Sequence, residues 1–221
     1  MKPAEFLARY FEERASAIIR CDDHDVAREA VAAAVRGGFG IVEFTLTVPR
    51  AYDLIREFST AHANLVVGAG TVLDRDQARR AVEAGARFLV SPVVEPEVIA
   101  TARELGVTIM PGVQTATEAL AAHRLGGQIQ KLFPPPPGGP DFVRYLLGPL
   151  PFLRLVPTAG VDGDNVAEWI AAGVFAVGFV GTLFRAEDLR LGRYDAITER
   201  ARTLLAATRK AERPRRAWSF E

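Results

Sequence analysis

A recurring pattern of apolar and polar positions divides the chain into helix–strand units. In several units an amphipathic segment ends at one or two glycines, and a short apolar run follows, as in residues 83–90, 104–110 and 124–129. Glycine readily adopts the left-handed conformation that ends a helix. Short runs rich in Val, Ile and Phe are typical of strands buried on both faces. The alternation therefore predicts parallel strands joined by helices.

The pattern places eight strands and a helix after each of them. The predicted strands are residues 17–20, 41–45, 65–68, 88–91, 108–110, 129–133, 153–156 and 175–179. The predicted helices are residues 25–36, 49–60, 75–84, 95–105, 115–125, 141–147, 164–172 and 194–208, with one more helix, residues 3–14, before the first strand. Eight such units favour a (β/α)8 TIM barrel with an additional N-terminal helix. An open doubly wound sheet is the alternative.

Local signals support several of the predicted helix starts. Pro49 suits a first helical turn, where its missing N–H costs nothing. Asp74 can cap the helix that follows it. Thr115 and Glu118 have the spacing of a capping box. These signals mark where three of the predicted helices begin.

Composition indicates one globular domain. The 221 residues are 49% hydrophobic and 24% charged, and the formal net charge is zero. No linker-like stretch interrupts the pattern, so we expect a single barrel domain over residues 1–221. Within it we place the N-terminal helix in residues 1–15 and a basic tail in residues 209–221.

Charge and apolar runs also narrow the partners and the location. No basic tract precedes residues 213–216, so we expect no nucleic-acid partner. No apolar run approaches the ~18 residues of a membrane span, and the N-terminus has no apolar signal core. The single cysteine, Cys21, excludes an internal disulfide. We therefore expect a cytoplasmic protein that does not bind membranes.

The chemistry is expected at the carboxyl ends of the strands, where barrels of this kind carry their active sites. Strand periodicity places Glu43 on the inner side of its strand, and it places Lys131 on the same face as Ile129 and Phe133. Lys131 stands out because the chain has only three lysines among 27 basic residues, and the other two lie near the termini. An arginine cannot act as an amine nucleophile, whereas a lysine can.

Lys131 and Glu43 allow two interpretations. The first is a structural ion pair, or a lysine whose stem packs while its amine reaches water. The second is an amine that forms a Schiff base beside a carboxylate that moves protons. The second interpretation also accounts for Arg20, Thr47 and Thr71 at the same end, since these residue types suit an anionic ligand.

Glycine-rich segments follow several strands. The run 68–70 lacks the third glycine of a dinucleotide fingerprint. After a predicted strand it is instead expected to form a tight turn that brings the Thr71 hydroxyl close to a ligand. Residues 157–160 and 178–182 follow strands seven and eight, where barrels commonly bind phosphate. The three histidines show no metal-ligand spacing with the carboxylates, so we expect no metal.

Taken together, these motifs make the chain resemble the 2-keto-3-deoxy-6-phosphogluconate (KDPG) / 4-hydroxy-2-oxoglutarate (KHG) aldolase family. The resemblance extends from about residue 17 to residue 201. It rests on the motifs IVEFTLT at residues 41–47, VGAGTVL at 67–73, VSP at 90–92, MPGV at 110–113, KLFP at 131–134 and VPTAG at 156–160. The resemblance implies a class I aldolase on a (β/α)8 barrel, with no metal or cofactor, that assembles as a homotrimer.

The resemblance also implies roles for individual residues. Lys131 is the Schiff-base lysine and Glu43 the general acid/base. The expected reaction cleaves KDPG, a 2-keto acid, to pyruvate and glyceraldehyde 3-phosphate. The residues expected to bind the substrate are Arg20, Thr47, Thr71, Pro92, Phe133, Ala159, Gly160, Gly181 and Thr182.

The chain departs from the family pattern in the loops expected to bind phosphate. Ala159 stands where members typically have glycine, and Val180 and Gly181 stand where they have glycine and serine. The alternative substrate is therefore KHG or another non-phosphorylated 2-keto acid. Alternatives of other classes are a barrel that binds a keto acid or sugar phosphate without turnover, and a scaffold protein.

Overall fold

A ring of eight parallel strands forms the centre of the protein. The computed structural model describes residues 1–214. The strands are β1 (Ala15–Ile19), β2 (Ile41–Thr45), β3 (Val66–Gly70), β4 (Phe88–Ser91), β5 (Thr108–Val113), β6 (Gln130–Leu132), β7 (Leu155–Pro157) and β8 (Val177–Phe179). From β1 to β7 each strand pairs with the next, and β1 also pairs with β8. A single bridge between Thr158 and Gly178 joins the last gap, so the strands form a nearly closed barrel. The predicted (β/α)8 fold is confirmed.

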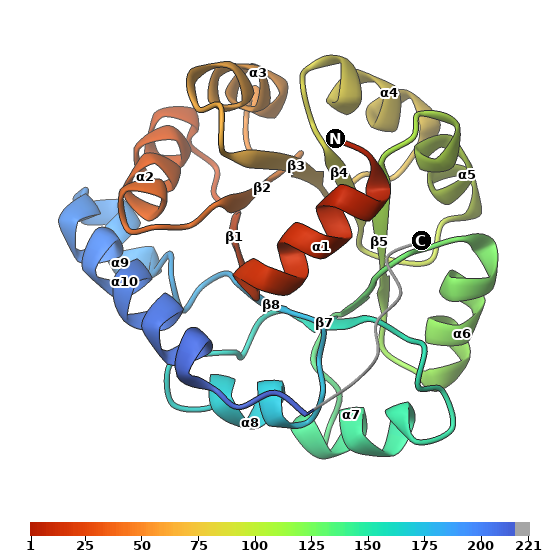
Figure 1. Ribbon diagram of the computed structural model, residues 1–221. Helices are drawn as coiled ribbons and strands as arrows, with labels where there is room; N and C mark the ends of the chain where they lie inside the picture. The colour runs from red at the N-terminus through yellow and green to blue at the C-terminus, as the bar shows by residue number, and fades with distance from the viewer. Residues whose placement is uncertain (215–221) are drawn as a thin grey trace.

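Helices surround the barrel and one helix crosses its end (Figure 1). The helices are α1 (Pro3–Glu13), α2 (His24–Arg36), α3 (Ala51–Ala61), α4 (Arg75–Glu83), α5 (Pro96–Glu104), α6 (Ala116–Leu125), α7 (Pro140–Leu147), α8 (Val166–Ala171), α9 (Ala186–Leu191) and α10 (Tyr194–Lys210). The six-residue helix α9 is absent from the sequence prediction, since it is too short to show a period. Among residues 1–214, no helix is both long and apolar enough to cross a membrane.

The capping predictions are confirmed at two helices and wrong at a third. The Asp74 carboxylate accepts a hydrogen bond from the Gln77 N–H at 2.8 Å. Thr115 and Glu118 form the expected capping box. Pro49 lies outside α3, because Arg50 adopts a left-handed φ of 55° and the helix begins only at Ala51.

Strands β3 and β5 extend two and three residues beyond their predicted carboxyl ends. The run 68–70 is not a turn, because β3 continues through Gly70 and pairs with β2 along its whole length. Strand β5 likewise continues through Pro111 and Gly112 to Val113. Glycine inside a strand is unfavourable, and proline cannot donate a hydrogen bond to the sheet. Close neighbours explain the glycines here. A Cβ at Gly112, for example, would overlap the Pro92 carbonyl oxygen.

Helix α1 closes the amino-terminal end of the barrel. Its buried face, Phe6, Leu7 and Tyr10, packs against the first inward residues of the strands. The rings of Phe6 and Phe88 stack with centroids 4.7 Å apart. The Tyr10 hydroxyl shares a 2.8 Å hydrogen bond with Ser16, and burial raises the pKa of Tyr10. Apolar packing at this end leaves the opposite end for chemistry.

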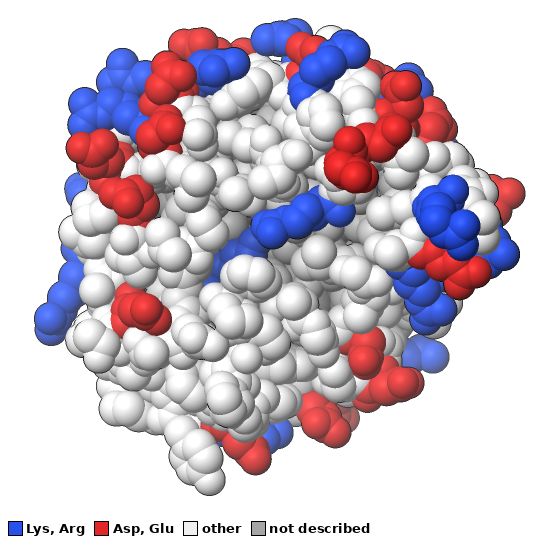
Figure 2. Space-filling view, turned by 180° about the vertical axis from the view of Figure 1, so that it is seen from behind, with Lys and Arg blue, Asp and Glu red and all other residues white. Residues whose placement is uncertain are grey.

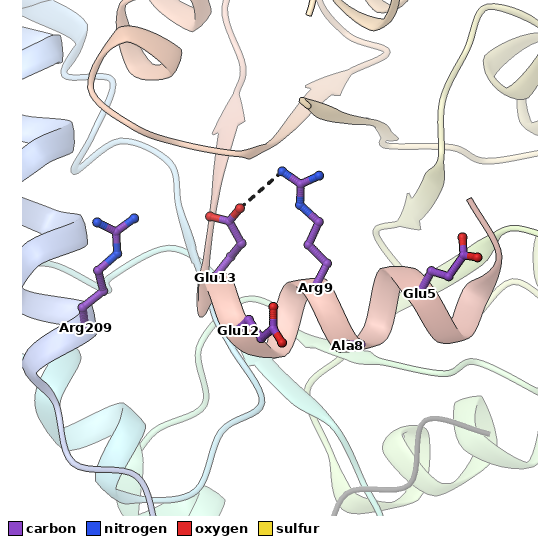
Figure 3. A pocket seen from close by; sticks show the side chains of 6 residues that line it. All are labelled: Glu5, Ala8, Arg9, Glu12, Glu13 and Arg209. Carbon is purple, nitrogen blue, oxygen red and sulfur yellow. Dashed lines mark hydrogen bonds and ion pairs between the residues drawn. The ribbon is translucent and has the colours of Figure 1, made fainter. Parts of the chain in front are cut away.

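The outer face of α1 is charged. Figure 3 shows Glu5, Arg9, Glu12 and Glu13 on this face, with Arg209 of α10 nearby, and Arg9 pairs with Glu13 at 3.4 Å. Helix α1 is therefore amphipathic, with one face in the barrel and one in solvent.

The C-terminal segment also packs at this end. The Arg213 guanidinium lies 3.9 Å from the centre of the Phe11 ring and donates to the carbonyls of Phe11 and Phe175. Of the predicted basic tail, Arg209 and Lys210 belong to the last turn of α10, and residues 215–221 lie outside the described residues.

Candidate active site

Lys131 and Glu43 meet inside the carboxyl end of the barrel. Lys131 is the middle residue of β6 and Glu43 is an inward residue of β2. Lys131 Nζ lies 3.4 Å from Glu43 Oε1, and the two side chains are 10% and 1% exposed. The pairing expected from strand periodicity is therefore present. Removing either partner would leave an uncompensated charge in a buried place, which is costly.

A small cavity opens at Lys131, and Glu43 is not among the residues that line it. It has a volume of about 110 Å³, and Lys131 and Arg20 are the basic residues in its lining. Figure 2 shows this end of the barrel, with basic side chains in a central hollow on a largely uncharged face, while most other charged side chains lie toward the rim. The predicted site residues that line the cavity are Arg20, Thr71, Pro92, Lys131, Phe133 and Ala159.

Arg20 and Thr71 reach toward each other across the cavity mouth. Arg20 follows β1, and its Nη2 donates a 3.2 Å hydrogen bond to the Thr71 hydroxyl. Thr71 follows β3 with a left-handed φ of 59°, a conformation that costs a non-glycine residue about 1–3 kcal/mol. An exposed guanidinium held above a buried amine is suited to a carboxylate that lies next to a carbonyl group.

Phe133 and Ala159 form apolar parts of the wall. Lys131 Nζ lies 5.8 Å from the centre of the Phe133 ring, within the range of a cation–π contact. Ala159 has a φ of 63°, so a second non-glycine residue with left-handed backbone lines the cavity.

Thr47 is not brought into the cavity. It is exposed, and its hydroxyl lies 2.9 Å from that of Thr45. The strand ends at Thr45, where the Val48 N–H bonds back to the Thr45 carbonyl in a turn. The period of two that places Glu43 inside therefore does not continue to Thr47.

The loops after β7 and β8 bond to each other beside the cavity. The Thr182 hydroxyl donates to the Val161 carbonyl at 2.7 Å. The Gly160 carbonyl accepts a 2.7 Å hydrogen bond from the Asn165 side chain. Neither Gly160, Gly181 nor Thr182 is among the residues that line the cavity.

Three residues that line the cavity, Ile18, Thr158 and Val180, are not among the predicted site residues. Thr158 is 1% exposed, and its hydroxyl has no hydrogen-bond partner within residues 1–214. Buried hydroxyl groups are nearly always paired, so this one is available to a ligand. The signal in the sequence is its position as the first polar residue after β7.

Cys21, next to Arg20, is no candidate nucleophile. Its thiol donates to the Asp23 carbonyl at 3.2 Å, and burial raises the pKa of the thiol. A raised pKa disfavours the reactive thiolate. Cys21 is partly buried and packs against the core.

Comparisons with known proteins agree with this geometry. The sequence model of the KDPG and KHG aldolase family matches residues 8–200. Over 172 residues the chain is 36% identical to the 2-dehydro-3-deoxy-6-phosphogalactonate aldolase of Escherichia coli (strain K12), covering 77% of this chain and 84% of the relative. It is 34% identical to the KHG/KDPG aldolase of the same organism, covering 77% and 80%.

Solved structures are similar as well. A KDPG aldolase from Legionella pneumophila, with pyruvate captured at low pH as a covalent carbinolamine intermediate, superposes with a TM-score of 0.78 at 25% identity. The alignment covers 92% of this chain and 98% of that one.

Proposed function

Because the chain belongs to the KDPG and KHG aldolase family, we propose that it is a class I aldolase in which Lys131 forms a Schiff base with a 2-keto acid. The observation that carries the proposal is the buried contact between Lys131 Nζ and Glu43 Oε1, 3.4 Å apart below the cavity. A structural ion pair would not require an open cavity above the amine, nor an arginine at its mouth.

The chemistry follows from the positions of these groups. The neutral amine of Lys131 attacks the keto carbon and forms a carbinolamine, whose hydroxyl group takes up a proton from solvent and leaves as water, so that a protonated imine forms. Glu43 removes the proton of the 4-hydroxyl group, the bond between C3 and C4 breaks, and the aldehyde departs. The imine nitrogen takes up the electron pair as an enamine. Glu43 then returns the proton to C3, and hydrolysis releases pyruvate and the free amine.

Arg20 and Thr71 hold the substrate in this scheme. Their hydrogen bond places a guanidinium and a hydroxyl at the cavity mouth, where both can bind the carboxylate at C1. Phe133 and Pro92 form apolar walls beside the imine. Thr158, whose hydroxyl is buried and unpaired among residues 1–214, can bond a substrate hydroxyl group.

Trapping of the imine tests this proposal. Pyruvate with sodium borohydride should reduce the imine to a stable adduct on Lys131, which peptide mass spectrometry can locate. The chain offers internal controls, because Lys2 and Lys210 are its other two lysines and both are exposed. An adduct on either of these lysines but not on Lys131, or no pyruvate-dependent adduct, would reject the Schiff-base mechanism.

KDPG is the first candidate substrate, as the sequence suggests. The relatives named above support phosphorylated sugar acids, and they add 2-dehydro-3-deoxy-6-phosphogalactonate as a close variant. All these compounds share the 2-keto and 4-hydroxy groups on which Lys131 and Glu43 would act.

KHG, which has no phosphate, is a second candidate that the loops after β7 and β8 favour. Backbone N–H groups at the start of a helix commonly bind phosphate. Here the Asp162 carboxylate accepts the N–H groups of Asp164 and Asn165 at 2.9 Å. The Thr182 hydroxyl donates to the Val161 carbonyl, and the Val180 side chain lines the cavity.

A comparison of substrates separates the two candidates. Pyruvate release should be measured with KDPG, with its galactonate isomer and with KHG, and kcat/KM compared. The highest value for KDPG supports the first candidate, the highest value for the galactonate isomer supports that variant, and the highest value for KHG supports the second candidate. Failure with all three, despite imine trapping, would point to another 4-hydroxy-2-keto acid.

The proposal includes the homotrimer and the cytoplasmic location expected from the sequence. Sedimentation should give three times the mass of the 24.0 kDa chain. A monomer would reject the trimer without affecting the chemistry.

A further inference from the structure

Strand β3 carries two glycines on its inner face. Gly68 and Gly70 lie two residues apart, so both point into the barrel. Neither has the positive φ that only glycine adopts easily. Glycine inside a strand is unfavourable because it is flexible when unfolded and offers no side chain to pack. Both positions therefore call for an explanation in the space around them.

Gly70 leaves room for the Glu43 carboxylate. A Cβ at position 70 would overlap Glu43 Oε1 and would lie 2.7 Å from Glu43 Cδ and 3.0 Å from Cγ. Oε1 is also the atom that contacts Lys131 Nζ at 3.4 Å. The oxygen that an alanine would displace is thus the one that faces the amine.

Gly68 leaves room for a different side chain, that of Phe88. A Cβ at position 68 would overlap the ring of Phe88, and that ring is stacked on Phe6 of α1. The ring has little freedom to move, whereas a carboxylate at the end of a flexible side chain can turn away. An added methyl group should therefore disturb the packing at position 68 and the chemistry at position 70.

We propose that Gly70 is a positioning residue for the reaction. Because it has no side chain, it leaves the space that the Glu43 carboxylate needs to lie against the Lys131 amine. The role at position 70 rests on the proposed function, since it matters only if Glu43 moves protons for an imine on Lys131. Gly70 itself touches no reacting atom and acts entirely through Glu43.

The test is the variant Gly70→Ala, alone and combined with Glu43→Gln. We expect Gly70→Ala to lower kcat for pyruvate release on the order of 10²-fold, since a displacement of about 1 Å in a catalytic group has that effect. KM should change little and borohydride should still trap pyruvate on Lys131. In the Glu43→Gln background, Gly70→Ala should cause no further loss of kcat.

Gly163→Ala is a matched control. A Cβ at Gly163 would meet only Leu204, at 3.8 Å, and the residue lies outside the cavity lining. This variant should keep wild-type kcat. Wild-type kcat in Gly70→Ala would overturn the proposal, and so would losses that multiply in the double variant, because Gly70 would then act independently of Glu43.

Folding provides a second readout if Gly70→Ala is unstable. Glu43→Ala removes the carboxylate that the new methyl group would meet, so Glu43→Ala/Gly70→Ala should melt close to Glu43→Ala alone. A large further drop in melting temperature in that double variant would overturn the proposal.

The same measurements separate this proposal from the proposed function. Absence of a pyruvate adduct on wild-type Lys131 would reject the Schiff base. The dependence of the Gly70→Ala melting temperature on residue 43 would still report whether Gly70 makes room for the carboxylate.

Discussion

The two ends of the barrel interior are built from neighbouring positions on the same strands, yet they differ in kind. On β2 the inward residue Ile41 packs against α1, and Glu43, two residues further, lies at the carboxyl end beside Lys131. Ile129, the residue before β6, packs at the amino-terminal end, and Lys131 of β6 follows two residues later. In both places two residues of sequence separate a side chain that packs against α1 from a side chain of the Lys131–Glu43 pair.

The difference shows how the barrel can hold a buried charge pair. The amino-terminal end is filled by α1 and by large side chains such as Phe88 and Phe175. The carboxyl end contains the cavity and left-handed residues such as Thr71 and Ala159. Packing at one end offsets the cost of desolvated charge and strained backbone at the other. Substitutions at the carboxyl end of the barrel should therefore change activity, and substitutions at the amino-terminal end should change stability.

Lys131→Arg should have the largest effect on activity. Arginine keeps a positive charge opposite Glu43 but cannot form a Schiff base. We expect pyruvate release to fall to background and the borohydride adduct to disappear, while the circular dichroism spectrum stays that of the wild type. Lys210→Arg, at an exposed position of α10, should retain full activity. Turnover by Lys131→Arg above background would reject Lys131 as the nucleophile.

Glu43→Gln should separate imine formation from cleavage. The amide has the shape of the carboxylate but cannot accept a proton, and a general acid/base contributes about 10²–10⁴-fold. We expect kcat to fall within that range, with the adduct on Lys131 still detectable by mass spectrometry. An unchanged kcat would mean that another group moves the protons.

Short apolar runs predict the strands, and a period of two predicts the Lys131–Glu43 pair, because both signals are local in the sequence. They fail where a distant neighbour decides. The run 68–70 looks like a turn in isolation and is a strand, because Phe88 and Glu43 fill the space that its glycines leave. Thr47 shares the parity of Glu43, but a turn at Thr45 takes it out of the barrel.

Phe6→Ala tests how much the packing of α1 at the amino-terminal end of the barrel contributes to stability. Phe6 is fully buried and its ring stacks on Phe88, so the variant should lose about 3–5 kcal/mol of unfolding free energy. Urea denaturation measures this loss, and kcat of the folded enzyme at low temperature should remain near that of the wild type. Tyr145→Ala, at an 80% exposed aromatic residue of α7, should change stability by less than about 0.5 kcal/mol. A comparable loss of stability in both variants would contradict the assignment of packing to α1.

Tyr10→Phe should give the smallest effect, and the effect should depend on pH. The variant leaves the buried Ser16 hydroxyl without the 2.8 Å hydrogen bond, which should cost about 1–3 kcal/mol near neutral pH. Burial raises the pKa of Tyr10 above its ordinary value of 10.0, so above that pH the unfolded chain loses the phenol proton while the folded protein keeps it. Stability linked to Tyr10 is therefore complete below about pH 10 and declines as pH rises further, by up to about 1.4 kcal/mol per pH unit. Phenylalanine has no proton to lose, so the gap in unfolding free energy between wild type and Tyr10→Phe should narrow from about pH 9 to about pH 11. Urea denaturation at several pH values measures the gap, and a constant gap across this range would show that Tyr10 ionises equally in both states.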